Sequence, residues 1–277
     1  MSRPDGKKLP TPDSEGEGES KRTSLTKAIL TDATKCIGCE RCVQGCVQQN
    51  DLPPDYPARF KTNDGLSGAR LTSIMEIPGK DPNTSRFVRR QCMHCVDPTC
   101  AAACLVGALT KRADGPVHYD ADKCIGCRYC FQACPFKVPR FDFEKRVTRK
   151  CHMCYDRIPL LDYMKPACVA ACPVGALHFG YKSDIIREAK RRAQRRGGAG
   201  YIMGLAEAGG TDMLTVLPTR PQDLSLVVAP RKIVNHNLDK IRITAAGFMG
   251  ASGVACLLYL YAALTRGTDK EGHDSQQ

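Results

Sequence analysis

Several sequence signatures of substrate chemistry are missing from this chain of 277 residues. No G-x-G-x-x-G opens a helix, no P-loop is present, and no nucleophile and base stand at a recognisable spacing. Near the N-terminus, no apolar stretch follows the lysines and no twin-arginine pair is present, so we expect no export signal in the chain itself. These absences disfavour a catalytic role and leave the 17 cysteines as the principal feature.

The number of cysteines helps to decide between disulfide formation and metal binding. An odd total of 17 in a long chain disfavours a fully paired disulfide framework, which is typical of short secreted chains. Metal binding is therefore the leading explanation. The formal net charge of +12 would on its own indicate nucleic acid or an anionic membrane surface, but formal charge omits the charge of any bound metal group.

Sixteen of the cysteines form four groups of four. The first and third groups share the spacing C-x2-C-x2-C-x3-C and comprise Cys36, Cys39, Cys42 and Cys46, and Cys124, Cys127, Cys130 and Cys134. The second and fourth have wider middle gaps and comprise Cys92, Cys95, Cys100 and Cys104, and Cys151, Cys154, Cys168 and Cys172. Three closely spaced cysteines wrap one [4Fe–4S] cube, and the fourth reaches the other cube of a pair. A zinc site usually takes two separated C-x2-C pairs, so the fourth group on its own could bind zinc. The presence of the other three groups favours iron–sulfur clusters.

Internal repetition divides the groups into two types. The sequence K-C-I-G-C at residues 35–39 recurs at residues 123–127, and C-L-V-G-A-L at residues 104–109 recurs as C-P-V-G-A-L at residues 172–177. The groups therefore alternate as A, B, A, B, and each two-cluster unit is expected to join one A with one B. The spacing does not say which A belongs with which B.

The segments around the second and third groups resemble a known family. Residues 91–100 (QCMHCVDPTC) and residues 117–130, where V-H-Y-D leads into C-I-G-C-R-Y-C, are similar to the four-cluster ferredoxin-like electron-transfer (beta) subunits of membrane oxidoreductases. The iron–sulfur subunit of membrane-bound uptake hydrogenase looks most similar, because the chain runs from the clusters into a single C-terminal span, and the formate dehydrogenase beta subunit is also similar. The resemblance covers about residues 31–180 firmly and the C-terminal third loosely.

The resemblance implies four [4Fe–4S] clusters and assigns their ligands. In the family the first and fourth groups share one two-cluster unit, and the second and third share the other. The implied sets are Cys36, Cys39, Cys42 and Cys172; Cys46, Cys151, Cys154 and Cys168; Cys92, Cys95, Cys100 and Cys134; and Cys104, Cys124, Cys127 and Cys130. The chain departs from the family at Leu105, where proline commonly follows the fourth cysteine, so this loop is expected to be looser. The missing export signal is a second departure.

The fold class that follows is α+β, with duplicated bacterial-type 2[4Fe–4S] ferredoxin-like modules and one C-terminal transmembrane helix. Between the cysteine loops we expect short strands and single-turn helices. Beyond them, the spacing of Ile185, Ile186, Ala189 and Ala193 predicts a helix at 182–196. The expected segments are a disordered tail at 1–23, the four-cluster domain at 24–180, a helix, a short strand (213–217) and a connector at 181–240, the span at 241–266, and a polar tail at 267–277.

An uncharged stretch of 22 residues at 243–264 predicts the membrane span. At about 1.5 Å per residue it is roughly 33 Å long, enough to cross a hydrocarbon core of about 30 Å. Tyr259 and Tyr261 lie near one end, where interfacial aromatics are favoured. A row of small residues would allow close helix packing in lipid: Gly247, Ala251 and Ala255. A buried core helix is the alternative, and Cys256 is expected to pack within this stretch.

Histidines and cations near the cysteines have more than one interpretation. His94 and His152 lie within their groups, but sixteen thiolates suffice for four cubes, so hydrogen bonding or packing is favoured over ligation. Six cations flank cysteines and would either be solvated or favour reduced clusters: Lys35, Arg41, Lys123, Arg128, Lys137 and Arg140. Four oxidised cubes would bring a charge of about −8, so the formal +12 falls to about +4 and the case for nucleic acid largely disappears.

These observations predict an electron relay rather than an enzyme. By resemblance, the partners are a catalytic subunit (hydrogenase or molybdenum-type dehydrogenase or reductase), a membrane cytochrome or quinone-reactive subunit, and the lipid bilayer. One alternative is a soluble polyferredoxin-like carrier without a span, and another is a zinc-stapled basic protein that binds nucleic acid. We expect the protein at a prokaryotic cytoplasmic membrane. The Lys and Arg residues around the span place the clusters in the cytoplasm, whereas the family's export together with a signal-bearing partner places them outside, which we favour.

Overall fold

The computed structural model describes residues 26–53, 64–77, 86–157, 164–195 and 200–224. All of these belong to the first of two compact units, which comprises residues 1–233. Within these ranges, no helix is long and apolar enough to cross a bilayer. The predicted span at 243–264, Cys256 and the two predicted tails lie outside the described residues.

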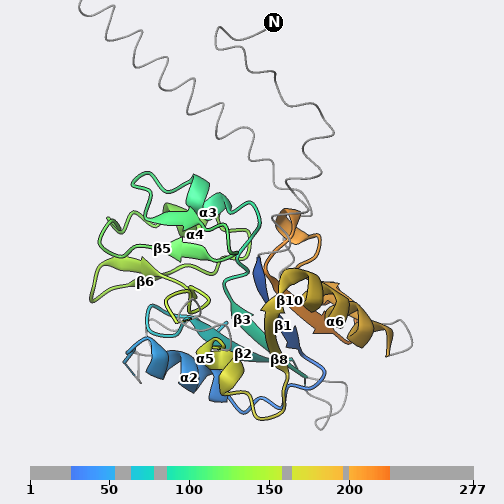
Figure 1. Ribbon diagram of the computed structural model, residues 1–277. Coiled ribbons are helices and arrows are strands. Elements are labelled where there is room, and N and C mark those ends of the chain that lie inside the picture. The colour runs from blue at the N-terminus through green and yellow to red at the C-terminus, as the bar shows by residue number, and fades with distance from the viewer. Residues whose placement is uncertain (1–25, 54–63, 78–85, 158–163, 196–199, 225–277) are drawn as a thin grey trace, which may run out of the picture. The chain divides into compact units, whose positions relative to one another are not determined.

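A four-stranded sheet supports the cysteine-containing segments (Figure 1). Its strand order is β8 (Leu177–Tyr181), β1 (Lys27–Asp32), β10 (Met213–Leu217) and β9 (Tyr201–Met203). The central strand β1 runs antiparallel to β8 and parallel to β10, with Ile29 level with both Phe179 and Met213. Apart from Lys27, every residue of β1 and β10 is buried, as expected for apolar strands in the middle of a covered sheet.

Helix α6 (Lys182–Gln194) packs against this sheet. Ile185 and Ala189, one helical turn apart, pack with Leu30 of β1 and Leu214 of β10. Basic residues in the last helical turn and Asp184 in the first complement the helix dipole. The helix and strand β10 occupy the positions at which the sequence predicts a helix and a strand.

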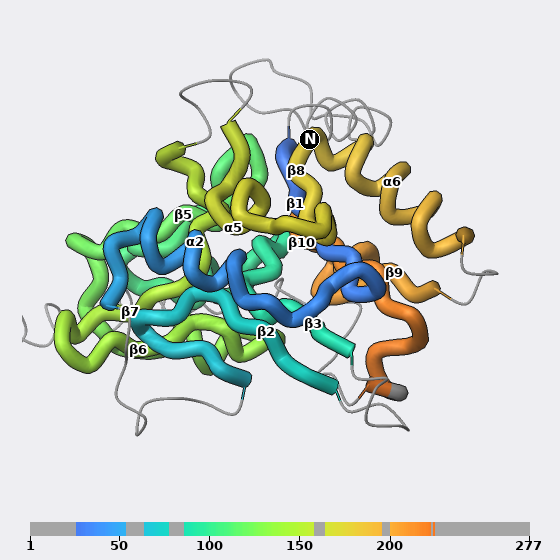
Figure 2. The backbone as a smooth tube through the Cα atoms, turned by 90° about the horizontal axis from the view of Figure 1, so that it is seen from below, coloured from blue at the N-terminus to red at the C-terminus, as the bar shows by residue number. Residues whose placement is uncertain are grey.

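Each cysteine group includes one short helix, and these four helices pack in two pairs. Helix α2 (Arg41–Gln49) packs against α5 (Ala167–Ala170), and α3 (Thr99–Ala102) packs against α4 (Tyr129–Ala133). Figure 2 shows α2 beside α5, and Figure 1 shows α3 with α4 on the other side of β3. The first and fourth groups are thereby brought together, as are the second and third.

Three antiparallel hairpins surround these helices. They pair β2 (Thr72–Ile77) with β3 (Arg86–Gln91), β4 (Leu109–Lys111) with β5 (Val117–Tyr119), and β6 (Arg140–Asp142) with β7 (Val147–Arg149). Short 3-10 helices occupy Glu207–Gly209 and Pro221–Leu224. Mixed, short elements of this kind agree with the predicted α+β character of the cysteine-rich part.

The two A-type groups share an unusual backbone conformation. Gly38 and Gly126 have φ angles of 71° and 70°, and Glu40 and Arg128 also take the left-handed conformation immediately before α2 and α4. Glycine is required at positions 38 and 126. A Cβ on Gly126 would lie 2.5 Å from the Arg146 carbonyl oxygen, and one on Gly38 would lie 2.7 Å from a ring carbon.

The two B-type groups are also alike. Cys100 and Cys168 both occupy the second position of a four-residue helix, and Gly107 and Gly175 in the following loops have φ angles of 65° and 59°. The loop after the second group therefore has a left-handed glycine like the loop after the fourth group, although Leu105 stands where the fourth group has Pro173. Leu105 itself is 70% exposed.

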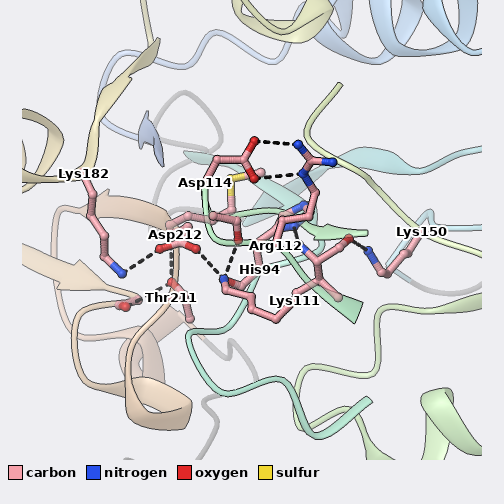
Figure 3. Close-up of polar contacts among 12 residues, drawn as sticks. His94, Lys111, Arg112, Asp114, Lys150, Lys182, Thr211 and Asp212 are labelled. Carbon is pink, nitrogen blue, oxygen red and sulfur yellow. Dashed lines mark hydrogen bonds and ion pairs between the residues drawn. The ribbon is translucent and has the colours of Figure 1, made fainter. Parts of the chain in front are cut away.

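Asp212, immediately before β10, joins the sheet to the loop of the second group (Figure 3). Its carboxylate accepts hydrogen bonds from the Nζ atoms of Lys111 and Lys182, both at 2.6 Å. Its backbone N–H donates to the His94 carbonyl at 3.1 Å, and Lys111 donates to the same carbonyl at 3.3 Å. Because Asp212 is only 1% exposed, its charge depends on these two cations. The network fixes the loop around His94 against the sheet.

Candidate metal centres

Three of the cysteine sets implied by the resemblance each line one pocket. The first centre is lined by Cys36, Cys39, Cys42 and Cys172. The second is lined by Cys46, Cys151, Cys154 and Cys168, and the fourth by Cys104, Cys124, Cys127 and Cys130. The third centre is the remaining set, Cys92, Cys95, Cys100 and Cys134, whose members are all buried and close enough for the other three to raise the pKa of the Cys95 thiol, after the larger effect of burial.

The pockets of the first, second and fourth centres contain about 380, 310 and 320 Å³ of atom-free space, open mouths included. Within the described ranges, no three His, Cys, Asp or Glu side chains converge closely enough to hold one ion. Tetrahedral zinc with Zn–S bonds of about 2.3 Å would need sulfurs only ~3.8 Å apart. The sets fit a cluster of several atoms better than the zinc alternative.

N–H groups point at cysteine sulfur atoms in the centres, and in the third, where burial raises the pKa of Cys134, backbone N–H groups lower it. The donors and acceptors are Ala176 N–H to Cys172 Sγ at 3.3 Å, Met153 N–H to Cys151 Sγ at 3.4 Å, Thr148 N–H to Cys124 Sγ at 3.5 Å, and the Asn50 side chain to Cys46 Sγ at 3.6 Å. Such bonds favour the thiolate form that metal binding requires. Hydrogen bonds to sulfur also raise or lower the potential of a bound cluster.

Burial opposes ionisation of several of these thiols. It raises the pKa of Cys42 and Cys154 to about 11 and the pKa of Cys100 and Cys151 to about 12. At Cys42 and Cys151 the next influence in size is Arg89, which lowers the pKa. Because a metal ligand must be a thiolate, binding of iron must displace these protons.

The two histidines within the groups bond to other protein atoms. His94 is fully buried, its Nδ1 accepts the Val117 N–H at 2.9 Å, and burial lowers its pKa well below the usual value, so the ring is neutral. His152 Nε2 bonds to Asn50 Oδ1, and Asn50 bonds in turn to Cys46 Sγ. His94 therefore supports the start of β5, and His152 touches the second centre through Asn50.

The six cations flanking the cysteines lie mainly in solvent. Five are exposed: Lys35, Arg41, Lys123, Arg128 and Lys137. Arg140 pairs with Asp64 at 2.8 Å. Two other cations, Arg89 and Lys150, are each only 3% exposed and lie beside cysteines. The sequence did not predict either of them, although Lys150 precedes Cys151 just as Lys35 and Lys123 precede the first cysteines of their groups.

The centres follow one another in the order first, second, third and fourth. Arg89 lines the pockets of both the first and the second. Cys151 of the second and Cys92 of the third belong to one core cluster, and Cys92 raises the pKa of Cys151, after the larger effects of burial and Arg89. Cys100 of the third and Cys130 of the fourth belong to another core cluster. The four sets thus form a continuous series.

The two ends of the series are open and its middle is closed. Cys39 of the first centre and Cys127 of the fourth are exposed, whereas all eight cysteines of the second and third centres are buried. Beside the two exposed cysteines, Ile37 and Ile125 are 57% and 64% exposed. Val174 and Val106, which line the pockets of the first and fourth centres, are also exposed, so each end presents more than one apolar side chain to solvent.

Comparisons with known proteins agree with this geometry. A family described as 4Fe-4S dicluster domain matches residues 84–182. The chain is 31% identical over 284 residues to the hydrogenase-2 operon protein HybA of Escherichia coli O157:H7, covering 89% of this chain and 86% of that protein. It is 34% identical over 200 residues to the nitrate-inducible formate dehydrogenase iron-sulfur subunit of Escherichia coli K12, covering 69% and 67%. It is 39% identical over 194 residues to a protein of Nitratidesulfovibrio vulgaris, of which it covers about half, 52%.

The fold and the cysteine sets define a ferredoxin-like iron–sulfur protein of mixed helix and strand content, with [4Fe–4S] clusters as its cofactors. The chain belongs to the family of iron–sulfur electron-transfer proteins that contains HybA and the formate dehydrogenase iron-sulfur subunits. The predicted family and type of cofactor are thereby confirmed. The assignment of each cysteine to a cluster stays a prediction.

Proposed function

We propose that the protein passes single electrons along four [4Fe–4S] clusters as the iron–sulfur subunit of an oxidoreductase complex of hydrogenase or formate dehydrogenase type. The observation that carries the proposal is the series of four cysteine sets, closed in the middle and open at both ends. When bound, each cluster takes up and gives back one electron. The names of the relatives support a catalytic subunit as one partner.

The sixteen cysteines are proposed to hold the four clusters in two units of duplicated origin. The packing of α2 against α5 and of α3 against α4 supports one A-type and one B-type group in each unit. In every centre three cysteines of one group then meet the last cysteine of the other. The matched conformations at Gly38 and Gly126, and at Gly107 and Gly175, support a duplicated module.

The chain's own residues would hold and enclose the clusters and provide surfaces for partner subunits. The cysteines of the middle centres are buried, so bound clusters there would be shielded from water. Apolar core residues such as Met93, Met153 and Phe136 surround these cysteines. At the ends, Ile37 and Ile125 leave apolar surface beside Cys39 and Cys127 for partner subunits. One end would meet the catalytic subunit, and the other a membrane cytochrome or quinone-reactive subunit.

Iron analysis of anaerobically purified protein tests the relay directly. Four cubes require about sixteen irons per chain, and two cubes require about eight. About sixteen irons, with no stoichiometric zinc, is the expected result. Zinc without iron would end the proposal, and about eight irons would contradict four clusters.

We further propose that residues 241–266 span the cytoplasmic membrane and that the clusters lie outside it, after export with a signal-bearing partner. The uncharged stretch of 22 residues supports the span. Alkaline extraction should leave the protein in the membrane, and release would favour the soluble carrier. Protease added to spheroplasts should digest the cluster domain, and protection would place it in the cytoplasm.

A further inference from the structure

Arg89 occupies the boundary between the first two centres. It lies in β3, level with Ile74 of the paired strand β2. It lines the pocket of Cys36, Cys39, Cys42 and Cys172 and also the pocket of Cys46, Cys151, Cys154 and Cys168. Since it is only 3% exposed, water cannot solvate its charge well. One cation therefore borders two cysteine sets at once.

The guanidinium of Arg89 has no carboxylate partner in the described part of the chain. Its Nε donates to Thr72 Oγ1 at 2.9 Å, and its Nη1 is buried with no hydrogen-bond partner among the described residues. The adjacent Arg90, by contrast, pairs with Asp64 at 3.3 Å. A buried ion without a counter-charge is strongly destabilising, so a negative group should lie on the unpaired side of Arg89.

The cysteines of both centres act on this side chain. Burial by itself lowers the pKa of Arg89, but the thiols of Cys168, Cys42, Cys151 and Cys46 together raise it above its ordinary value. Cys42 belongs to the first centre and the other three to the second. The anions that would compensate Arg89 are therefore the ligands of two different clusters.

We propose that Arg89 is the shared counter-charge of the first and second clusters and raises the reduction potential of both. The proposal rests on the ligand sets of the proposed function. Reduction changes the charge of a cube with its thiolates from about −2 to about −3, so a fixed cation in a poorly solvated site stabilises the reduced state more than the oxidised state. Because one side chain borders both pockets, its charge moves the two potentials in the same direction. Arg89 thereby raises both potentials while changing the difference between them little.

The test uses the full-length, cluster-loaded protein in redox titrations followed by low-temperature EPR. Variants Cys39→Ser and Cys154→Ser assign the signals of the first and second centres. In Arg89→Gln, the ratio of reduced to oxidised cluster at a fixed potential should fall about tenfold at both of these centres, which is about 59 mV for one electron. The third and fourth centres should not change. Arg89→Lys keeps the charge and should restore most of the ratio, and Arg90→Gln should leave the first two centres unchanged.

A second pair of variants leaves Arg89 in place and serves if Arg89→Gln does not load its clusters. Thr72→Asp puts a carboxylate beside the guanidinium Nε and should lower both potentials by neutralising it. Thr72→Asn has nearly the same shape without the charge and should not. The two differ in one charge, so loss of the Thr72 hydrogen bond cannot explain a difference between them.

Several results would overturn the proposal. Unchanged potentials at the first and second centres in Arg89→Gln, or in Thr72→Asp when Arg89→Gln does not load, would remove the counter-charge role. An Arg89→Lys shift as large as that of Arg89→Gln, or equal shifts at all four centres, would show a structural role only. Iron content is measured first on the wild-type protein, where fewer than about sixteen irons would count against the proposed function and not against Arg89.

Discussion

The middle centres of the series depend on fixed interior cations to compensate negative charge, whereas the end centres are also open to solvent. At the ends, Cys39 and Cys127 are exposed, so water and ions reach the ligands. In the middle all eight cysteines are buried, and there the chain places cations without carboxylate partners in the described ranges. Solvent screens charge at no structural cost, whereas a closed site needs a fixed counter-charge. We therefore expect the interior cations, rather than the many surface ones, to have the larger effect on the potentials of bound clusters.

Lys150 is the second of these interior cations. It is 3% exposed and donates from Nζ to the carbonyl oxygens of Val117 at 2.5 Å and Cys151 at 3.1 Å. Burial and Cys92 raise the pKa of Cys100, and Lys150 lowers it. Cys151 belongs to the second centre and Cys100 to the third. Lys150 therefore lies beside Cys151 of the second centre and affects Cys100 of the third.

Removing one ligand should have the largest effect, and a larger effect in the middle than at an end. Cys168→Ala should lose at least four of about sixteen irons and lower the melting temperature clearly, because Cys168 lies in the main core on α5, packed against α2. Cys127→Ala at the open fourth centre should lower the melting temperature less, since water can take the ligand position. Iron analysis and thermal unfolding measure both effects. An equal or larger loss of stability in Cys127→Ala would break the distinction.

Neutralising an interior cation should shift potentials where neutralising a surface one does not. Lys150→Met should lower the potentials of the second and third centres by on the order of 60 mV, a tenfold change in the one-electron equilibrium. The control is Lys123→Met at the fourth centre, where the lysine side chain is 62% exposed and screened by solvent. EPR-monitored titration gives both values. A larger shift in Lys123→Met would reverse the interpretation.

A change of about the same free energy is expected for partner binding at an open end. Ile125→Asp places a charge on the apolar surface beside Cys127 and should weaken assembly about tenfold, or about 1.4 kcal/mol, while the EPR signals stay as in the wild type. Leu205→Asp, at an exposed position that lines none of the cysteine pockets, is the matched control. Co-purification of partner subunits from native membranes measures the effect. Equal assembly of Ile125→Asp and wild type would exclude this surface as a docking site.

Cysteine spacing predicted which cysteines share one loop, because the members of each group are close in sequence. It did not predict the left-handed conformation that Gly38 and Gly126 have in the two tight C-x2-C-x2-C segments. Spacing could not tell which groups meet, because that depends on the packing of α2 with α5 across a long stretch of chain. The pairing came from the resemblance alone.

The interior cations escaped prediction for a related reason. Arg89 lies in the segment R-F-V-R-R-Q, which as a sequence resembles a solvated edge strand. Only the fold shows that Arg90 meets Asp64 while Arg89 lies between two cysteine sets. Nearness to cysteine in sequence was a poor guide, since five of the six flanking cations are exposed.

The position of β1 between β8 and β10 has a consequence for biosynthesis. The third and fourth centres draw all their cysteines from residues 92–134, a continuous segment that can close over its iron as soon as it leaves the ribosome. The first and second centres combine cysteines from both ends of the cysteine-rich part, and β1 has no neighbours in its sheet until β8 and β10 have been made. Closing so long a loop comes late in folding. Iron–sulfur loading should thus begin at the third and fourth centres and finish at the first and second.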